Sequence, residues 1–179
     1  LDPSHASLMP ELIQKHTPMK VDQVQDGMEV EPDHVYVIPP DRDMGIMNDV
    51  LVLSKLGISG GPRAPVNYFL HSLAKEKKEK AFAVILSGMG TDGTEGVRAV
   101  KADLGMVMVQ EPSSAKHDGM PGSVIRTGLA DYVLPPKDMP RHLIDYLKRF
   151  PIKAAPKLQQ SDKFPADYMR KVHMLIRNH

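Results

Sequence analysis

Residues 81–96, AFAVILSGMGTDGTEG, decide the fold, because an apolar run ends abruptly in a turn rich in glycine. The run over 81–86 predicts a strand that is buried on both faces, as in a parallel sheet covered by helices. Either Thr91 or Thr94 can cap a helix that continues through 97–102. We therefore expect this turn to lie beyond the carboxyl end of a strand and to form part of a site, because open α/β sheets bind ligands there.

The acid in this turn, Asp92, has three interpretations. The first is a turn and helix-start residue, because a carboxylate interacts favourably with the positive end of a helix dipole. The second is a dinucleotide site. Its pattern Gly-x-Gly-x-x-Gly is matched by Gly88, Gly90 and Gly93, and Glu111 follows about twenty residues later beside another strand.

The third interpretation is a hydrolase. There the carboxylate accepts a hydrogen bond from a histidine ring and stabilises the imidazolium that forms when a serine attacks. The surrounding glycines suit this role, because they let backbone N–H groups approach a developing oxyanion, and each such donor contributes about 3 kcal/mol. A dinucleotide site ranks behind the hydrolase, because Asp92 would repel a pyrophosphate from the phosphate cradle.

The composition is that of an ordinary globular protein. The chain has 179 residues, 41% hydrophobic and 25% charged, and a chain of this length buries about 70% of its unfolded surface in one main domain. A net charge of +1, with no Trp and few other aromatic residues, argues against a nucleic-acid partner. The lack of Cys fits a reducing compartment. No apolar stretch reaches the roughly 18 residues of a membrane span, so we expect a cytoplasmic protein without membrane insertion.

Hydrophobic periodicity predicts elements along the whole chain. Expected helices cover 4–15, 66–80, 97–102, 124–127, 138–149 and 165–177. Expected strands cover 21–24, 35–38, 81–86, 105–109 and 132–134, with a hairpin formed by 44–47 and 50–53. The second half alternates strand and helix, which implies right-handed crossovers and an α/β fold with a doubly wound, mostly parallel sheet.

Several ordered motifs over residues 1–150 resemble the catalytic domain of the chemotaxis protein-glutamate methylesterases, the CheB type. The motifs are DGM at 26–28, VEPDHVYVIPP at 30–40, FLHSLA at 69–74, LSGMGTDG at 86–93 and GMP at 119–121. The resemblance implies a Rossmann-like, three-layer α/β hydrolase that uses a serine nucleophile. Its substrates would be methyl esters on glutamates of methyl-accepting chemotaxis receptors, and it could also deamidate receptor glutamines.

By this resemblance Asp92 is the acid of a Ser-His-Asp triad, and the backbone N–H of Met89 is an oxyanion donor. The substrate-binding residues would be Gly88, Gly90 and Met120. In the family the serine and the histidine precede the segment that residues 1–3 resemble. We therefore expect both groups upstream of Leu1, a fold that lacks its first strands, and little esterase activity from this polypeptide alone.

The resemblance also suggests an organisation of the chain. It consists of a methylesterase-like domain over 1–150, a linker over 151–164 and a helical tail over 165–179. In some relatives a receptor methyltransferase domain follows, and residues 168–172 would be its start. A nucleotide-binding α/β module and a non-catalytic interaction domain are the alternatives to the hydrolase.

Other reactive residue types are given structural roles. GISGG at 57–61 resembles a nucleophile turn but lacks the strand-to-helix context. His5 falls in a first helical turn, His71 is expected to pack on a helix, and Ser87 to bond to backbone. The residues expected only to line the cleft are Glu111 and Ser114. No three of the eight histidines have the spacing of a zinc site, so we expect neither metal nor cofactor.

Overall fold

The computed structural model describes residues 8–55 and 63–149. Its centre is a parallel sheet of β6 (Phe82–Ile85), β7 (Met106–Gln110) and β8 (Tyr132–Leu134), in that order. The register places Ala83 beside Val107 and Val109 beside Val133. Because the three strands are parallel, their carboxyl ends share one edge of the sheet.

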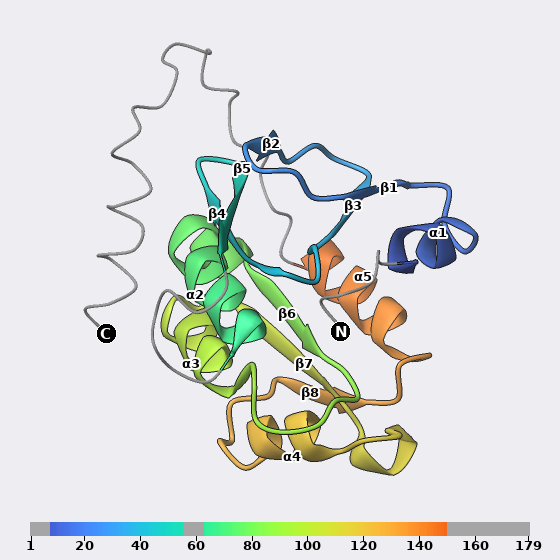
Figure 1. Cartoon of the computed structure of the whole chain (residues 1–179). Coiled ribbons are helices and arrows are strands. Elements are labelled where there is room, and N and C mark those ends of the chain that lie inside the picture. The colour runs from blue at the N-terminus through green and yellow to red at the C-terminus, as the bar shows by residue number, and fades with distance from the viewer. Residues whose placement is uncertain (1–7, 56–62, 150–179) are drawn as a thin grey trace.

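Helices cover both faces of this sheet, so the domain has three layers (Figure 1). They are α2 (Pro65–Lys77), α3 (Thr94–Ala102), α4 (Gly119–Ile125) and α5 (Met139–Arg149). The face toward α2, α3 and α4 presents Ala83, Ile85, Val107 and Val109. On the opposite face Met106 and Met108 pack against Met139 of α5. The alternation of strand and helix from β6 to α5 confirms the α/β fold predicted from the sequence.

An antiparallel sheet packs on the other side of α2. Its strands, in order, are β2 (Met28–Glu29), β5 (Val50–Lys55) and β4 (Arg42–Met47). The expected hairpin is confirmed, and its turn residues Asn48 and Asp49 have φ of 52° and 61°, as a two-residue turn requires. The core of this sheet packs against Phe69 and Leu73 of α2. Helix α2 therefore lies between the hairpin and α3.

The first described residues form a helix and two short strands. They are α1 (Met9–Gln14), β1 (Lys20–Gln23) and β3 (His34–Val37), and the two strands pair in parallel. The VEPDHVYVIPP motif is held by Tyr36, whose hydroxyl accepts from the Glu31 N–H at 2.9 Å and donates to the Glu29 carbonyl at 3.2 Å. Tyr36 therefore has a structural role within this motif.

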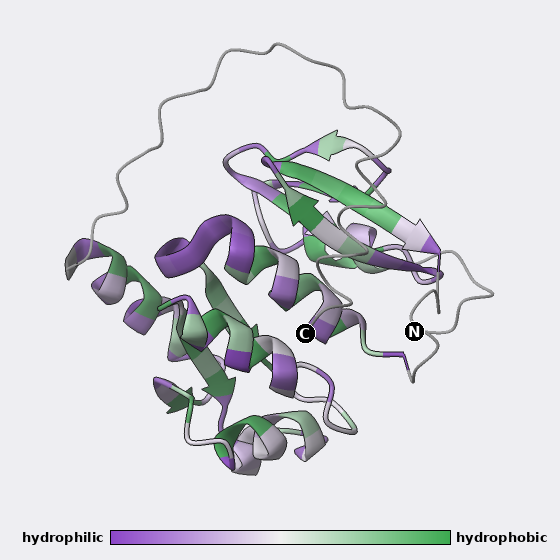
Figure 2. Cartoon of the chain, turned by 90° about the vertical axis from the view of Figure 1, so that its left-hand side faces the viewer, coloured by the Kyte–Doolittle hydropathy of each residue, from purple (hydrophilic) through white to green (hydrophobic). Residues whose placement is uncertain are grey.

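The surface of α2 changes character toward its end. Figure 2 shows apolar residues gathered on the strands and the inner helix faces, and hydrophilic residues at the end of α2 and in the following 3-10 turn, Lys78–Lys80. The expected solvated end is confirmed in part, because Lys75 and Glu79 are exposed. Lys77, however, forms an ion pair with Asp49 in the hairpin turn.

The structure corrects three of the predicted details. Strand β6 is not buried on both faces: Val84 is 45% exposed, because β6 lies at the edge of the described sheet. The N-cap of α3 is Gly93, with φ of 96°, and neither Thr91 nor Thr94 caps the helix. Helix α4 begins at Gly119 and not at 124, because packing of its side chains outweighs the poor helix propensity of its glycines.

Several expected features lie outside the described residues. They are the start of the first helix at 4–7, which includes His5, the GISGG turn at 57–61, the linker at 151–164 and the tail at 165–179.

Candidate functional site

Two loops meet at the carboxyl end of the parallel sheet, and they bring together every site residue suggested by the sequence (Figure 1). The loop after β6 carries Gly88, Met89, Gly90 and Asp92. The loop after β7 leads into α4, whose second residue is Met120. The site therefore occupies the edge at which open α/β sheets bind ligands.

Backbone hydrogen bonds tie the two loops together. The Gly88 N–H donates to the His117 carbonyl at 2.9 Å, and the Met120 N–H donates to the Gly88 carbonyl at 2.9 Å. The hydroxyl of Ser87 accepts from the His117 N–H at 3.0 Å. This contact confirms that Ser87 bonds to backbone, as the sequence predicted.

Two glycines lie at the points where these loops cross. A Cβ on Gly88 would lie 2.3 Å from the sulfur of Met120, and one on Gly119 would lie 2.9 Å from the Gly90 nitrogen. The Met120 side chain thus lies directly over the Gly88 backbone. A side chain at Gly119 would meet backbone and separate the loops, whereas a methyl group at Gly88 would displace the flexible end of the Met120 side chain.

A buried side-chain amide forms hydrogen bonds with both loops, and the sequence analysis did not single it out. Gln110, at the end of β7, is only 6% exposed. Its Oε1 accepts from the Ser87 N–H at 2.8 Å, and its Nε2 donates to the Ser114 carbonyl at 3.0 Å. The available signal was a polar residue at the end of the apolar run MVMV. Ser114 itself donates to the Glu111 carbonyl at 2.8 Å, which is a structural role.

The carboxylate of Asp92 lies at the amino end of α2. Its Oδ2 accepts from the Val66 N–H at 3.1 Å, and its Oδ1 accepts from the Asn67 N–H at 2.9 Å. These are first-turn amides that have no partner inside the helix, and a carboxylate there typically contributes about 0.5–2 kcal/mol. Asp92 is thus a helix-start residue, but the helix is α2 and not the α3 that follows it in sequence.

Backbone donors of the same loop have no partner among the described residues. The Met89 N–H donates no hydrogen bond there, and neither do the amides of the next four residues. Met89 is 76% exposed, and Gly90 and Gly93 adopt left-handed φ values of 80° and 96°. Met89, Gly90 and Thr91 are exposed whereas Gly93 is buried, so the first part of the loop lies at the surface beside a fixed carboxylate.

A second carboxylate contributes to the electrostatics of this region. Burial raises the pKa of Asp43 on β4, the positive charge of Arg63 lowers it, and the negative charge of Asp92 raises it. Burial likewise raises the pKa of Tyr68 on α2, although a hydrogen bond with Ser54 works in the opposite direction. The amino end of α2 therefore lies among several charged and polar groups.

The arrangement does not favour a dinucleotide. In a phosphate cradle the glycine amides point at the pyrophosphate, whereas the Gly88 N–H is already bonded to the His117 carbonyl. The Asp92 carboxylate lies in the same loop and would repel the phosphates.

His71 is half-buried on α2, as a packed histidine would be.

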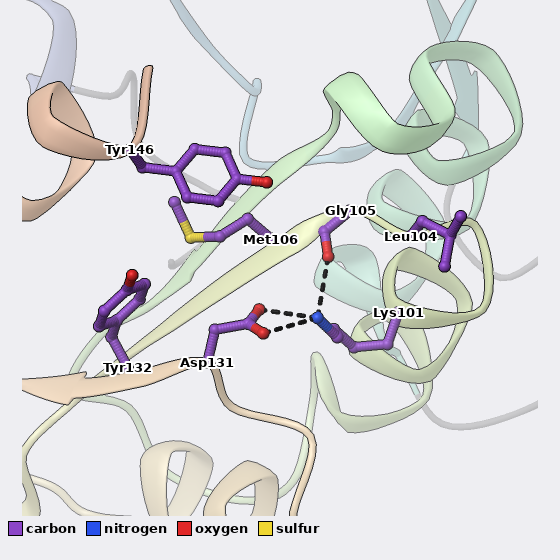
Figure 3. A pocket seen from close by; sticks show the side chains of 7 residues that line it. All are labelled: Lys101, Leu104, Gly105, Met106, Asp131, Tyr132 and Tyr146. Carbon is purple, nitrogen blue, oxygen red and sulfur yellow. Dashed lines mark hydrogen bonds and ion pairs between the residues drawn. The ribbon is translucent and has the colours of Figure 1, made fainter. Parts of the chain in front are cut away.

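A hollow of about 260 Å³ lies at the opposite end of β7 (Figure 3). Its charged groups are Lys101 and Asp131. The Nζ of Lys101 lies 2.7 Å from Oδ1 and 2.8 Å from Oδ2 of Asp131. Lys101 also donates to the Gly105 carbonyl, and Asp131 accepts from the Val107 N–H. Because these groups are paired with each other and with backbone, we assign them a structural role.

Neither a metal-binding cluster nor a membrane-spanning helix occurs within the described ranges 8–55 and 63–149. No group of three or more His, Asp or Glu side chains there is placed to hold a metal ion. Within the same ranges, every helix is too short or too polar to cross a lipid bilayer.

Comparison with known proteins identifies relatives of the whole domain. A model of the CheB methylesterase family matches residues 1–143. A protein-glutamate methylesterase/protein-glutamine glutaminase of Thermotoga maritima is 38% identical over 131 residues, which are 71% of this chain and 38% of that protein. An uncharacterised 104.1 kDa protein from the hypE 3′ region of Rhodobacter capsulatus is 39% identical over 80% of this chain and 15% of its own length.

The fold is shared with a solved structure. The crystal structure of the Thermotoga maritima CheB methylesterase catalytic domain matches with a TM-score of 0.74 and 34% identity, over 82% of this chain and 79% of that one. The chain thus spans most of that catalytic domain but well under half the length of the two curated relatives.

Proposed function

The chain belongs to the CheB methylesterase family, and from this we propose that it forms part of a protein-glutamate methylesterase in which Asp92 is the triad acid. The substrates would be glutamate methyl esters of methyl-accepting chemotaxis receptors, with receptor glutamines as a second substrate. The reaction would take place in the cytoplasm. A receptor methyltransferase fused to the same protein would be a further partner.

One observation supports this proposal most strongly: a fixed carboxylate, and amides that have no partner within 8–55 and 63–149, share one loop at the carboxyl end of β6. Two backbone hydrogen bonds hold the Asp92 carboxylate at the start of α2. Each carboxylate oxygen has a second lone pair and can accept another hydrogen bond, such as that of a histidine ring. A carboxylate held in this way can orient an imidazole and stabilise its charge.

Ester hydrolysis also requires hydrogen-bond donors for the oxyanion, and backbone amides of this loop can supply them. Attack of a serine on the ester carbonyl places negative charge on the carbonyl oxygen, which backbone donors stabilise. In our proposal the Met89 N–H is such a donor. Gly90 lets the substrate approach the backbone, and Met120, whose side chain covers Gly88, forms an apolar wall beside it.

The remaining steps follow the general pattern of serine hydrolases. The histidine takes the serine proton and passes it to the leaving methoxide, so methanol departs and an acyl-enzyme remains. Water then attacks the acyl group and restores the serine, leaving a glutamate carboxylate. The proposal assigns the serine and the histidine to positions outside the described residues.

Methanol release from methylated receptors tests the role of Asp92. In the full-length natural protein, Asp92→Asn should lower the rate by about four powers of ten, because the asparagine amide favours the wrong histidine tautomer. The asparagine still has one acceptor oxygen for α2, so the helix cap is retained in part.

Glu95→Gln is the matched control. Glu95 lies three residues further on, is exposed and pairs with Arg98 on the surface of α3, so its variant should release methanol at the wild-type rate. An undiminished rate for Asp92→Asn would remove Asp92 from the mechanism.

A further inference from the structure

Asn67 bonds to both sides of the loop that carries Asp92. Its backbone N–H donates to Oδ1 of Asp92 at 2.9 Å, and its side-chain Oδ1 accepts from the Gly96 N–H at 2.9 Å. Gly96 lies in the first turn of α3, where amides have no partner inside the helix. Asn67 thus joins the start of α2 to the start of α3, with Asp92 between them.

The loop around Asp92 depends on such anchors. Gly90 and Gly93, on either side of Asp92, have left-handed φ values. Because a glycine has no Cβ, its backbone is only weakly restricted by steric contacts, so other contacts must fix the loop. The side with Gly93 is fixed by α3, and α3 in turn is hydrogen-bonded to α2 by the Asn67 side chain. If that bond is lost, helix packing and the two bonds of Asp92 to α2 still hold the loop, but less rigidly, so the carboxylate can turn by a small amount.

We propose, on the basis of the methylesterase function proposed above, that Asn67 is a positioning residue for Asp92. Its amide holds α3 against α2, so the carboxylate keeps the orientation that a histidine requires. This role acts through Asp92 and needs no contact between Asn67 and the substrate. Small displacements matter here, because a misplacement of about 1 Å can lower a rate about a hundredfold.

Three variants of the full-length natural protein test this role, with methanol release normalised to folded protein. Asn67→Ala should lower kcat about ten- to a hundredfold while KM changes by less than about twofold. Asn67→Asp retains an acceptor of the same length and should restore kcat to within about threefold of wild type. Hydrogen exchange of the Gly96 amide should be faster in Asn67→Ala and close to wild type in Asn67→Asp.

Thr94→Val is the matched control. It removes the bond of 3.0 Å between the hydroxyls of Thr94 and Ser123, at the same end of α3, and leaves the contacts of Asn67 intact. Its kcat should equal that of the wild type.

The outcomes separate the two proposals. An unchanged kcat for Asn67→Ala, or a loss that Asn67→Asp does not restore, overturns the positioning role while Asp92→Asn still shows the function. Equal methanol release by wild type and Asp92→Asn overturns the proposed function, and the role of Asn67 with it.

Discussion

Gly96 of α3 faces Leu70 of α2 so closely that a Cβ on Gly96 would lie 2.6 Å from the Leu70 Cβ. The same Cβ would lie 3.1 Å from the Cα of Asn67. These are atoms at or next to the backbone, which no change of rotamer can move away. The contact between the two helices therefore requires a residue without a side chain, and it sets the distance across which Asn67 bonds to α3.

The first prediction concerns this contact. Gly96→Ala should destabilise the domain by about 1–3 kcal/mol, because the added methyl group forces the helices apart. Helix propensity alone predicts the opposite sign, a gain of about 0.5–1 kcal/mol for replacing a helical glycine by alanine. Urea denaturation measures the difference.

Arg98→Ala provides the comparison for this substitution. Arg98 is exposed on the same helix, so its loss should change the stability by less than about 0.5 kcal/mol. A Gly96→Ala protein more stable than wild type would show that the helices can separate without loss.

The sequence predicted the elements of the fold that depend on local pattern. The run over 81–86, the glycine turn and the alternation that follows located β6, α3, β7 and β8, because hydrophobic period and turn chemistry act locally. Asn48–Asp49 located the hairpin for the same reason. Exposure of Val84 was not predicted, since it depends on which strands and helices lie beside β6.

The site was predicted less completely than the fold. Asp92 and the glycines around it were identified, but their partners on other elements were not. The contacts of Asp92 with α2, of Asn67 with Gly96 and of Gln110 with Ser87 join residues that are 23 to 29 positions apart. Short sequence patterns contain no information about such pairs.

A second prediction concerns the ion pair in the hollow of Figure 3. Asp131→Ala should destabilise the domain by about 1–3 kcal/mol, because the Val107 N–H in the central strand loses its carboxylate acceptor. Lys101→Ala should cost less, about 0.5–1 kcal/mol, since the pair is partly exposed and water can replace the ammonium group. Thermal or urea unfolding of both variants gives the comparison. Equal losses would mean that the ion pair, and not the backbone contact, is the main contribution of Asp131.

A third prediction tests the crossing of the two loops. Gly88→Ala places a methyl group against the Met120 sulfur and should cost about 0.5–1.5 kcal/mol, because the flexible end of the Met120 side chain must move to another rotamer. Met120→Ala removes the obstructing side chain, so the double variant should be more stable than the sum of the single losses predicts, by about 0.5–1 kcal/mol. A double-mutant cycle measured by denaturation gives this coupling. Strict additivity would indicate that Met120 does not lie over Gly88 in solution.

The last prediction is a pH dependence that originates at Asp43. Its pKa is raised in the folded protein, chiefly by burial, so the folded state binds this proton more tightly than the unfolded chain does. When the pH rises through the ordinary value of 3.8, the unfolded chain loses the proton first, and the contribution of Asp43 to stability falls until the folded group has ionised as well.

Asp43→Asn removes this titration. The stability of the variant minus that of the wild type should therefore increase from strongly acidic to neutral pH, whatever its value at the acidic end. Urea denaturation at a series of pH values measures the difference. Arg63→Ala sharpens the test, because the Arg63 charge opposes the rise in pKa. In an Arg63→Ala background the increase should be larger. A difference between Asp43→Asn and wild type that stays constant with pH would show that the Asp43 carboxyl titrates alike in the folded and unfolded states.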